Sequence, residues 1–316
     1  MSKKINIQSL IRKQSFFLIA IIVVLSLTVT LINPRFISAQ NITNLFKQIS
    51  VMGICSIAMA IILITGGFDL SIGSLLSFVA CLIATLINMG VPELVAILLG
   101  VLGGTLCGAL NGAIIAYSGC APVIITLGSM GIFKGAALLI AGGNIINLKG
   151  DLPILNTTTL LGFPTIVYIY LAIVVLAFVI LQTTVFGRRI YSLGGNEEAT
   201  FLAGVNIIAA KIAVYTLSGF IVSFAALALL MRLGSASAVM GDSYTLNAVA
   251  AAVIGGISIS GGKGNIGGCF LGILLLGIIS NAMNLLGVTA YLQDIILGLI
   301  VIIAAVVSVL GSNKKI

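Results

Sequence analysis

Ten stretches of the chain consist almost entirely of apolar residues, and short segments rich in Gly, Pro, Asn or charged residues separate them. Apolar residues occupy every face of these stretches, which is typical of helices surrounded by lipid or by other apolar helices. Most of them reach the roughly 17–25 residues that a membrane-spanning helix needs. The predicted helices are Phe16–Ile32, Asn44–Ile64, Ser71–Ile87, Glu93–Tyr117, Pro122–Ala141, Thr165–Gln182, Lys211–Met231, Asn247–Ile257, Ile266–Leu286 and Ala290–Leu310.

The composition supports an all-α integral membrane protein with about ten transmembrane helices. Of the 316 residues, 60% are apolar and only 7% are charged, against roughly 45–50% and about 25% in soluble domains. Ten spans of ~20 residues would use ~200 residues. Residues 1–316 are therefore expected to form a single transmembrane domain with no separate soluble domain. The eighth stretch is short for a full span, so it is expected to be broken or to continue into the glycine-rich segment after it.

The positive charges predict the orientation of the helices. If the N-terminus is cytoplasmic, ten Lys and Arg residues lie on the inner side and four on the outer side, which fits the positive-inside rule and places the C-terminus inside as well. Lys134 lies within the fifth helix. The inner residues are Lys3, Lys4, Arg12, Lys13, Arg188, Arg189, Lys211, Lys263, Lys314 and Lys315, and the outer ones are Arg35, Lys47, Lys149 and Arg232.

Two connecting segments exceed about 20 residues, and long loops often carry contacts with partners. Residues 142–164 form an external, nearly neutral loop in the predicted orientation. Residues 183–210 form a cytoplasmic loop, and they hold the densest charge in the middle of the chain.

Two internal similarities indicate an inverted repeat of helices two to five and seven to ten. Gly66–Gly73 resembles Gly255–Gly262, and Asn111, Ile125, Leu127 and Gly128 recur at a constant offset as Asn281, Ile295, Leu297 and Gly298. Inverted repeats are common in transporters, with the substrate near the repeat interface. The two offsets differ, so both similarities cannot belong to one simple repeat. Glycines at every fourth position of the fourth helix, from Gly100 to Gly112, predict close helix packing.

Several chemistries are excluded. The chain has no His and only seven acidic residues, so imidazole metal sites, Ser-His triads and His proton relays are absent. The five Cys residues have no CxxC spacing, and we interpret them as small apolar residues. The glycine-rich segment 262–267 lacks the strand and soluble βαβ unit of a dinucleotide site. The positive charges form no stripe with aromatic residues, so no nucleic-acid partner is expected. No metal, cofactor or catalytic residue is predicted, and the chain is not expected to be an enzyme.

The most informative segment lies in the cytoplasmic loop. Asn196 suits a helix N-cap, Glu197 and Glu198 follow in the first turn, and Gly204 suits a helix stop. These signals predict a helix of about seven residues. Because such a short helix is only marginally stable alone, it needs something to pack against: either the chain itself, as an ordinary connector, or a cytoplasmic partner.

The segment 186–206, together with Thr65–Ser74 and Val253–Gly264, closely resembles the permease subunits of bacterial ABC importers for ribose and related monosaccharides. The resemblance covers the chain from about residue 40 to the C-terminus. It implies a permease in the bacterial cytoplasmic (inner) membrane that pairs with a second permease to form a pore. It also implies a cytoplasmic ATPase that docks on the short helix and an extracytoplasmic sugar-binding protein that delivers the sugar. The coupling-helix residues implied are Asn196, Glu197, Glu198, Ala199, Thr200 and Gly204.

One position departs from the family pattern, which usually has Glu-Leu-Asp before the eighth helix. This chain has Thr245-Leu246-Asn247 instead, so two acids are missing from what is expected to be the outer mouth.

A sugar path needs weak, replaceable hydrogen bonds, and polar residues inside a membrane are often functional. Interhelical hydrogen bonding is the alternative role for each candidate. Asp69 and Ser71 are candidates for gating or for capping the third helix. Lys134 either extends toward the outer surface or points into a vestibule. The path candidates are Asn111, Thr126, Asn281, Asn284, Gln293 and Asp294.

The predicted function is therefore the permease subunit of an ATP-driven monosaccharide importer, with ATP hydrolysis on a separate subunit. The alternative is an ion-coupled secondary sugar or solute transporter, which would need titratable or ion-coordinating groups near the midplane. An integral-membrane enzyme is a third possibility, but no nucleophile-base pair or metal-ligand set supports it.

Overall fold

The computed structural model describes residues 7–149, 159–160 and 162–313. The fold is almost entirely helical, with a few two-residue strands in the connections. The α-helices are α1 (Ile7–Ile32), α2 (Ala39–Ile64), α3 (Ile72–Asn88), α4 (Glu93–Ser118), α5 (Pro122–Ala141), α6 (Thr165–Thr183), α7 (Val185–Gly195), α8 (Glu197–Leu202), α9 (Ile207–Leu233), α10 (Asp242–Ile254), α11 (Ile266–Leu285) and α12 (Ala290–Asn313), and a 3₁₀ helix, η1 (Pro34–Ile37), joins α1 to α2.

The all-α membrane architecture is confirmed. Each of the ten predicted helices corresponds to one helix of the structure. Seven helices in the described part of the chain are long and apolar enough to cross a membrane: α1, α2, α4, α5, α6, α9 and α11. The apolar parts of α3 and α12 that could be assessed are shorter, Ile72–Asn88 and Ala290–Ile303.

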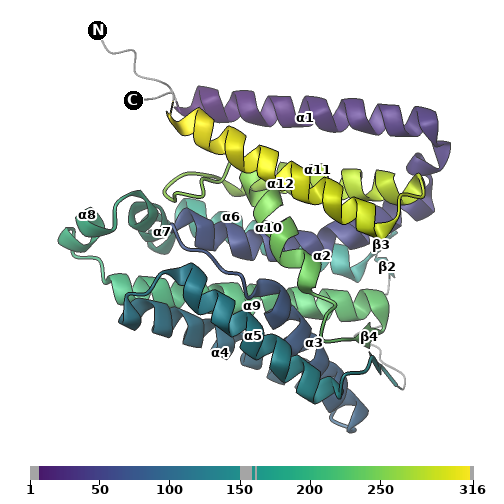
Figure 1. The fold of residues 1–316 in the computed structure, drawn as a ribbon, viewed down its shortest axis with the longest axis horizontal. Coiled ribbons are helices and arrows are strands. Elements are labelled where there is room, and N and C mark those ends of the chain that lie inside the picture. Colours follow the sequence, from purple (N-terminus) through teal and green to yellow (C-terminus); the bar gives the residue numbers. More distant parts are fainter. Residues whose placement is uncertain (1–6, 150–158, 161, 314–316) are drawn as a thin grey trace.

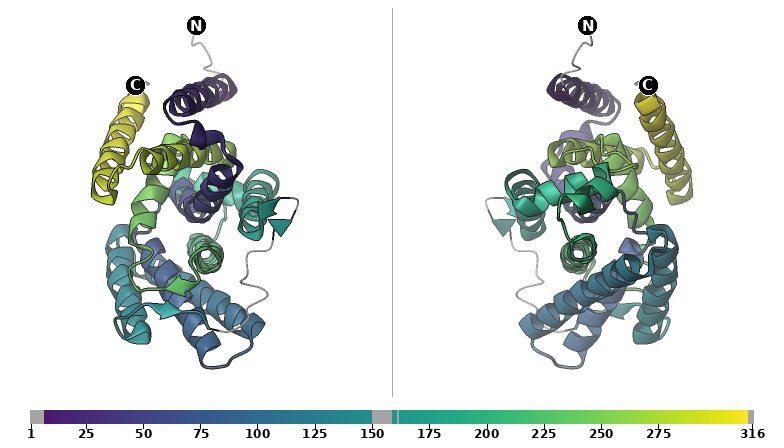
Figure 2. Two further views of the ribbon diagram at one scale, coloured as in Figure 1. Left: turned by 90° about the vertical axis from the view of Figure 1, so that its right-hand side faces the viewer. Right: turned by 90° about the vertical axis from the view of Figure 1, so that its left-hand side faces the viewer.

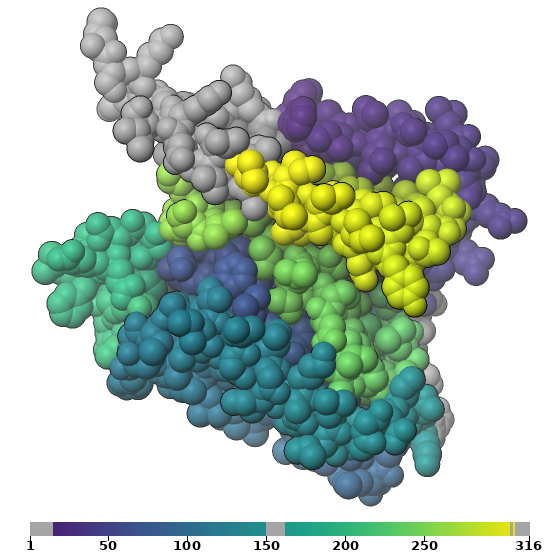
Figure 3. Space-filling view, in the orientation of Figure 1, coloured from purple at the N-terminus to yellow at the C-terminus, as the bar shows by residue number. Residues whose placement is uncertain are grey.

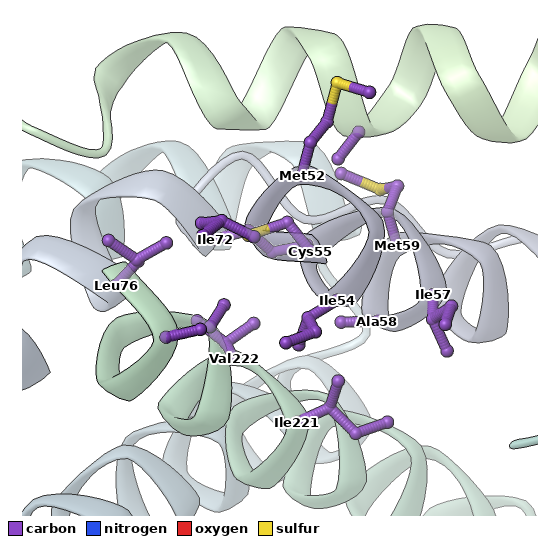
Figure 4. Packing of buried hydrophobic residues seen from close by; sticks show 14 of the residues in the cluster. Met52, Ile54, Cys55, Ile57, Ala58, Met59, Ile72, Leu76, Ile221 and Val222 are labelled. Atoms are coloured by element: carbon purple, nitrogen blue, oxygen red, sulfur yellow. The ribbon is translucent and has the colours of Figure 1, made fainter. Parts of the chain in front are cut away.

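Helix α2 forms the centre of the bundle (Figures 1 and 2). It packs against α6, α9, α10 and α11, and every residue from Ile49 to Ile64 is buried. Figure 4 shows side chains of α2 among Ile72 and Leu76 of α3 and Ile221 and Val222 of α9. A helix that is apolar on all faces suits this position, because no face of it has to meet water.

The outer helices α1, α4, α5 and α12 instead leave rows of large apolar side chains exposed, from Phe16 on α1 to Ile303 on α12. Exposed apolar area of this extent fits contact with lipid or with another subunit.

The glycines of α4 serve close packing inside the subunit, as one of the sequence interpretations predicts. A Cβ atom at Gly104, Gly108 or Gly112 would overlap atoms of α9, and Gly219 of α9 would overlap α4 in return. The helix backbones therefore touch along this seam, which is the small-residue packing common in membrane proteins.

The eighth predicted helix differs from the expected Asn247–Ile257. Helix α10 begins five residues earlier, at Asp242, and ends at Ile254. It does not continue into the glycine-rich segment, because Gly256 has a φ of +90° and turns the chain away.

The segment Thr245-Leu246-Asn247 lies near the start of α10, where Leu246 is 59% exposed and Asn247 is half-buried. Thr245 is buried, and its Oγ1 accepts a hydrogen bond from Gly73 N at 2.9 Å. Gly241 and Gly73 are in direct backbone contact. The N-terminal ends of the two short helices α3 and α10 therefore meet inside the bundle.

The strands lie at one end of the bundle. β1 (Ile146–Asn147) pairs antiparallel with β4 (Ser235–Ala236), and β2 (Thr159–Leu160) pairs with β3 (Phe163–Pro164). Much of the predicted loop 142–164 lies outside the described residues. At the opposite end lie α7 and α8, with the first turn of α1 and the last turn of α12 (Figure 1).

Candidate functional site

Helix α8 is the short helix that the sequence predicts, with six residues. The Asn196 side chain caps it, because its Oδ1 accepts a hydrogen bond from Ala199 N at 2.8 Å. After the helix, Gly204 has a φ of +83° and its N–H bonds to Phe201 O at 2.8 Å. The predicted cap and stop are both confirmed.

One side of α8 is held to the chain and the other is free. Thr200 is buried, and Glu197 pairs with Lys211 of α9 at 2.7 Å. Glu198 and Ala199 are exposed, and Phe201 and Leu202 are 65% and 78% exposed. Exposed large apolar side chains beside an acidic residue give this small helix a surface suited to a partner.

Helix α7 directly before α8 has no counterpart among the predicted helices. Thr184 caps it through a hydrogen bond from Gly187 N at 3.1 Å. Ile190 and Leu193 are buried. Apolar residues at 190 and 193 are an i, i+3 pair that could have indicated this helix.

A central polar cluster surrounds the start of α3. Asp69 Oδ1 accepts hydrogen bonds from Ser71 N at 2.7 Å and from Ser71 Oγ at 2.6 Å. Asn111 of α4 donates to Ser71 Oγ at 3.1 Å, and Ser129 of α5 donates to Asn111. We call Asp69, Ser71, Asn111, Thr126 and Ser129 the central polar cluster. All five are buried.

Neither capping candidate bonds to an amide of α3, because the Asp69 carboxyl bonds to Ser71, which precedes the helix. Ser71 occupies the N-cap position of α3 but makes no side-chain cap bond. Burial raises the pKa of the Asp69 carboxyl to about 6, although the two hydrogen bonds from Ser71 oppose this shift.

The loop that carries Asp69 is fixed from three other helices. Thr126 of α5 accepts a bond from Leu70 N at 3.1 Å. Tyr215 of α9 donates to Phe68 O at 3.1 Å, and Thr245 of α10 also contacts the loop. Tyr215 and Thr245 were not predicted, since nothing in the sequence links them to a loop more than 140 residues away.

The remaining path candidates lie in a different place. Asn281 of α11 exchanges two hydrogen bonds of 2.9 Å with Asn41 of α2. Gln293 of α12 donates to Asn284 Oδ1 at 2.9 Å. Asn281 and Asn284 line an open polar pocket of about 390 Å³, which sequence reasoning missed, together with Asn41, Asn44, Lys47, Gln48, Arg232, Leu233 and Leu285. Asp294 is exposed on α12.

The six path candidates therefore do not line one continuous path in the structure. Asn111 and Thr126 belong to the central polar cluster, whereas Asn281 and Asn284 line the pocket and Gln293 bonds to Asn284. Lys134 forms a half-exposed ion pair with Asp242 at the start of α10, with Nζ and Oδ2 2.7 Å apart. Among the described residues, no group of three or more His, Cys, Asp or Glu side chains could hold a metal ion.

Comparison with known proteins gives this architecture a family. The model of a family described as branched-chain amino acid transport system / permease component matches residues 41–305. The chain belongs to this permease family. The permease is thus a multi-pass protein of the cytoplasmic membrane and a subunit of an ABC importer, and its exposed helix α8 lies in the segment that carried the resemblance.

Curated relatives of the permease are named for sugars. It is 39% identical to the ribose import permease protein RbsC of Bacillus subtilis (99% of this chain, 96% of the relative) and 37% identical to that of Escherichia coli K12 (94% and 93%). It is 33% identical to the L-arabinose transport system permease protein AraH of Escherichia coli K12 (92% and 88%). No solved structure matches the permease. These relatives confirm the predicted resemblance and do not favour the ion-coupled alternative.

Proposed function

We propose that this chain is the membrane-spanning subunit of an ATP-driven importer for a ribose-like monosaccharide. The observation that carries the proposal is the similarity to ribose permeases along almost the whole chain. The description of the matched family mentions branched-chain amino acids, but the curated relatives with high coverage are named for ribose, allose and arabinose.

The chain forms a single permease domain, and segment 183–210 is its cytoplasmic coupling loop. ATP hydrolysis takes place on a separate ATPase subunit, which docks on α8 and contacts the exposed Glu198 and Ala199. The other coupling-helix residues shape and hold the helix: Asn196 and Gly204 define its ends, Glu197 pairs with Lys211, and Thr200 is buried. The free side of α8 supports this role, because Glu198, Phe201 and Leu202 project from the bundle. An extracytoplasmic sugar-binding protein delivers the sugar at the opposite end, near β1 and β4.

The helices cross the membrane about ten times, and both termini are cytoplasmic. The position of the first turn of α1 and the last turn of α12 at the end that holds α7 and α8 supports this orientation (Figure 1).

Helices α2–α5 and α9–α12 form an inverted repeat. Its support is a pattern of neighbours: α3 packs on α4, α5 and α9, and α10 packs on α11, α12 and α2 in the same way.

Two copies of the permease form the pore. The face that supports this pairing is built by α5, α10 and α12 (Figure 3). The helices that build it have exposed apolar side chains, including Ile124, Leu127 and Ile132 of α5 and Ile295 and Leu299 of α12. The glycines Gly128, Gly131 and Gly135 of α5 have open space beside them, which suits the close approach of a second helix.

The sugar meets exchangeable hydrogen-bonding groups on its way. Asn281, Asn284, Gln293 and Asp294 act on the outer side and Asn111 and Thr126 in the interior, with Asp69 and Ser71 holding the start of α3. ATP binding and hydrolysis shift α8, and rigid-body movement of the glycine-packed helices alternates access to the path.

The test is uptake of ribose into proteoliposomes that hold the chain, its ATPase and its binding protein. Uptake is expected to require ATP and to resist an uncoupler of ion gradients. Uptake without ATP that an uncoupler abolishes would contradict the proposal.

Substitution on α8 tests the coupling role. We expect Glu198→Lys to lower uptake at least tenfold while membrane insertion stays normal. The substitution places a positive charge at the N-terminus of α8, where the helix dipole is already positive and where the ATPase is proposed to bind. Gly204→Pro is expected to act in the same direction. Normal uptake together with normal ATPase association in both variants would refute the role.

A further inference from the structure

Three segments that are far apart in the sequence meet through their backbones beside α8. They are the loop after α2, the end of α7 and the loop after α10. Gly262 N donates a hydrogen bond to Ile64 O at 2.8 Å. A Cβ atom on Gly261 would lie 2.8 Å from both Gly66 Cα and Gly194 O. We call Gly66, Gly194, Gly261 and Gly262 the glycine junction.

The contacts at Gly194, Gly261 and Gly262 leave no room for side chains. A Cβ atom on Gly194 would overlap Ile64 O and would lie 2.5 Å from Gly262 N. Both of these atoms belong to the backbone, so neither can move aside as a flexible side chain can. Gly261 and Gly262 also have φ angles of +82° and +69°, which other residues rarely adopt.

Helix α7 connects the junction to α8 through a single residue. Asn196 ends α7 with a hydrogen bond from its N to Ser192 O at 3.0 Å, and its side chain caps α8. Helix α8 otherwise packs mainly on the start of α9. A displacement of α8 is therefore passed to α7 through Asn196 and to α9 through the ion pair between Glu197 and Lys211.

Beyond the junction, each glycine-rich loop leads to the start of a helix. Five residues after Gly66, the chain reaches Ser71 and the central polar cluster. On the other side, Tyr191 of α7 donates a hydrogen bond to Gly264 O at 3.0 Å, and the adjacent Asn265 caps α11. These two loops also resemble each other in sequence, as Gly66–Gly73 and Gly255–Gly262 show.

We propose that the glycine junction positions both repeats for transport: it passes a displacement of α7 to the starts of α3 and α11 together. Contact between backbones makes this possible, since no side-chain rotamer can absorb the movement. The inference rests on the proposed function, because the displacement comes from an ATPase that acts on α8.

The primary test compares neighbouring glycines of α7 in the complete importer. Gly194→Ala inserts a methyl group into the junction, whereas Gly195→Ala points its methyl group into open space. The measurements are ribose uptake and ATP hydrolysis on the same proteoliposomes. We expect Gly194→Ala to lower the ratio of ribose moved to ATP hydrolysed at least tenfold, and Gly195→Ala to keep it within twofold of the unsubstituted importer.

A second variant covers the case in which Gly194→Ala does not assemble. Tyr191→Phe removes only the hydroxyl that bonds to Gly264, so the fold and the ATPase contact are retained. We expect its ratio of ribose to ATP to fall about threefold, while ATP hydrolysis stays within twofold.

An unchanged ratio in Tyr191→Phe, or in an assembled Gly194→Ala importer, would overturn the proposal. A parallel loss of uptake and ATP hydrolysis would also overturn it, because a merely structural role lowers both. If the unsubstituted importer shows no ATP-dependent uptake, the proposed function fails instead, so the two failures are distinguishable.

Discussion

Among the acidic residues that the structure describes, Asp69 is the one whose side chain is buried. Its carboxyl is buried at the start of α3 and is held by two hydrogen bonds from Ser71. Asn at this position would keep the Oδ1 acceptor without a charge, whereas Ala would remove the acceptor as well. The two substitutions therefore separate the effect of the charge from the effect of the hydrogen bonds to Ser71.

The raised pKa of Asp69 predicts the sign of a pH effect. Because the pKa in the folded protein is about 6 and that of an unfolded Asp is about 3.9, burial favours the protonated form. Stability from this group is fully present below about pH 4 and is lost as the pH rises to about 6. We expect Asp69→Asn to raise the melting temperature at pH 7 and to have little effect near pH 4.

The control for this experiment is Asp69→Ala. Because it also removes the charge, it is expected to show the same pH dependence as Asp69→Asn. Its free energy of unfolding is expected to be lower than that of Asp69→Asn by about 1 kcal/mol at both pH values, because the hydrogen-bond acceptor for Ser71 is lost. A melting temperature of Asp69→Asn that follows the unsubstituted protein at every pH would contradict the assignment.

The sequence identified the residues of the central polar cluster better than their arrangement. Asn111 and Thr126 were chosen because polar groups are costly in apolar helices, and Asp69 and Ser71 were chosen as gating or capping candidates, whereas Ser129 was missed. Their partners could not be predicted, since Thr126 and Tyr215 reach the Asp69 loop only through packing of distant helices. The same limit explains why the pocket around Asn281 was missed.

At the scale of elements, α7 and α8 show what local signals can and cannot predict. Helix α8 has a cap, acidic residues in its first turn and a terminal glycine, and these signals are local. Helix α7 contains Gly187, Gly194 and Gly195 in eleven residues, and glycine disfavours helices by about 1 kcal/mol each. Tertiary contacts compensate for this cost, and a single sequence does not reveal them.

The seam between α4 and α9 makes a prediction about stability. Gly108→Ala would force a methyl group against the Tyr215 carbonyl and Gly219, whereas Gly103→Ala on the same helix meets only the flexible Leu82 side chain. We expect Gly108→Ala to lower the melting temperature in detergent by several degrees and Gly103→Ala to leave it almost unchanged. Equal melting temperatures of the two variants would argue against backbone contact along this seam.

At the scale of the whole molecule, the outward face of α5 makes a prediction about assembly. Leu127 of α5 and Leu98 of α4 are both about half exposed. Helix α5 helps to build the proposed contact face between two copies, and α4 does not. With the exposed Cys120 replaced by Ser, Leu127→Cys is expected to form a covalent dimer in membranes under oxidation, and Leu98→Cys is not. Equal cross-linking of both variants would indicate random collision.

The general architecture was predictable because a membrane-spanning helix needs a long run of apolar residues, which is visible in the sequence. The ends of the short helices were harder to predict. Those of α10 depend on the contact between Gly241 and Gly73 and on the turn at Gly256. The meeting of the ends of α3 and α10 inside the bundle is a property of the assembled molecule alone.

The enclosed position of α2 has a consequence for biogenesis. This helix leaves the ribosome long before α9, α10 and α11, which supply most of its neighbours. During synthesis its apolar surface must first be solvated by lipid, and its final partners displace those lipids later. Exchanging lipid for helix brings little hydrophobic gain, so tight packing has to drive the step. A chain truncated after α8 is therefore expected to insert α2 into the bilayer but to leave it open to proteolysis and to degradation by membrane quality control.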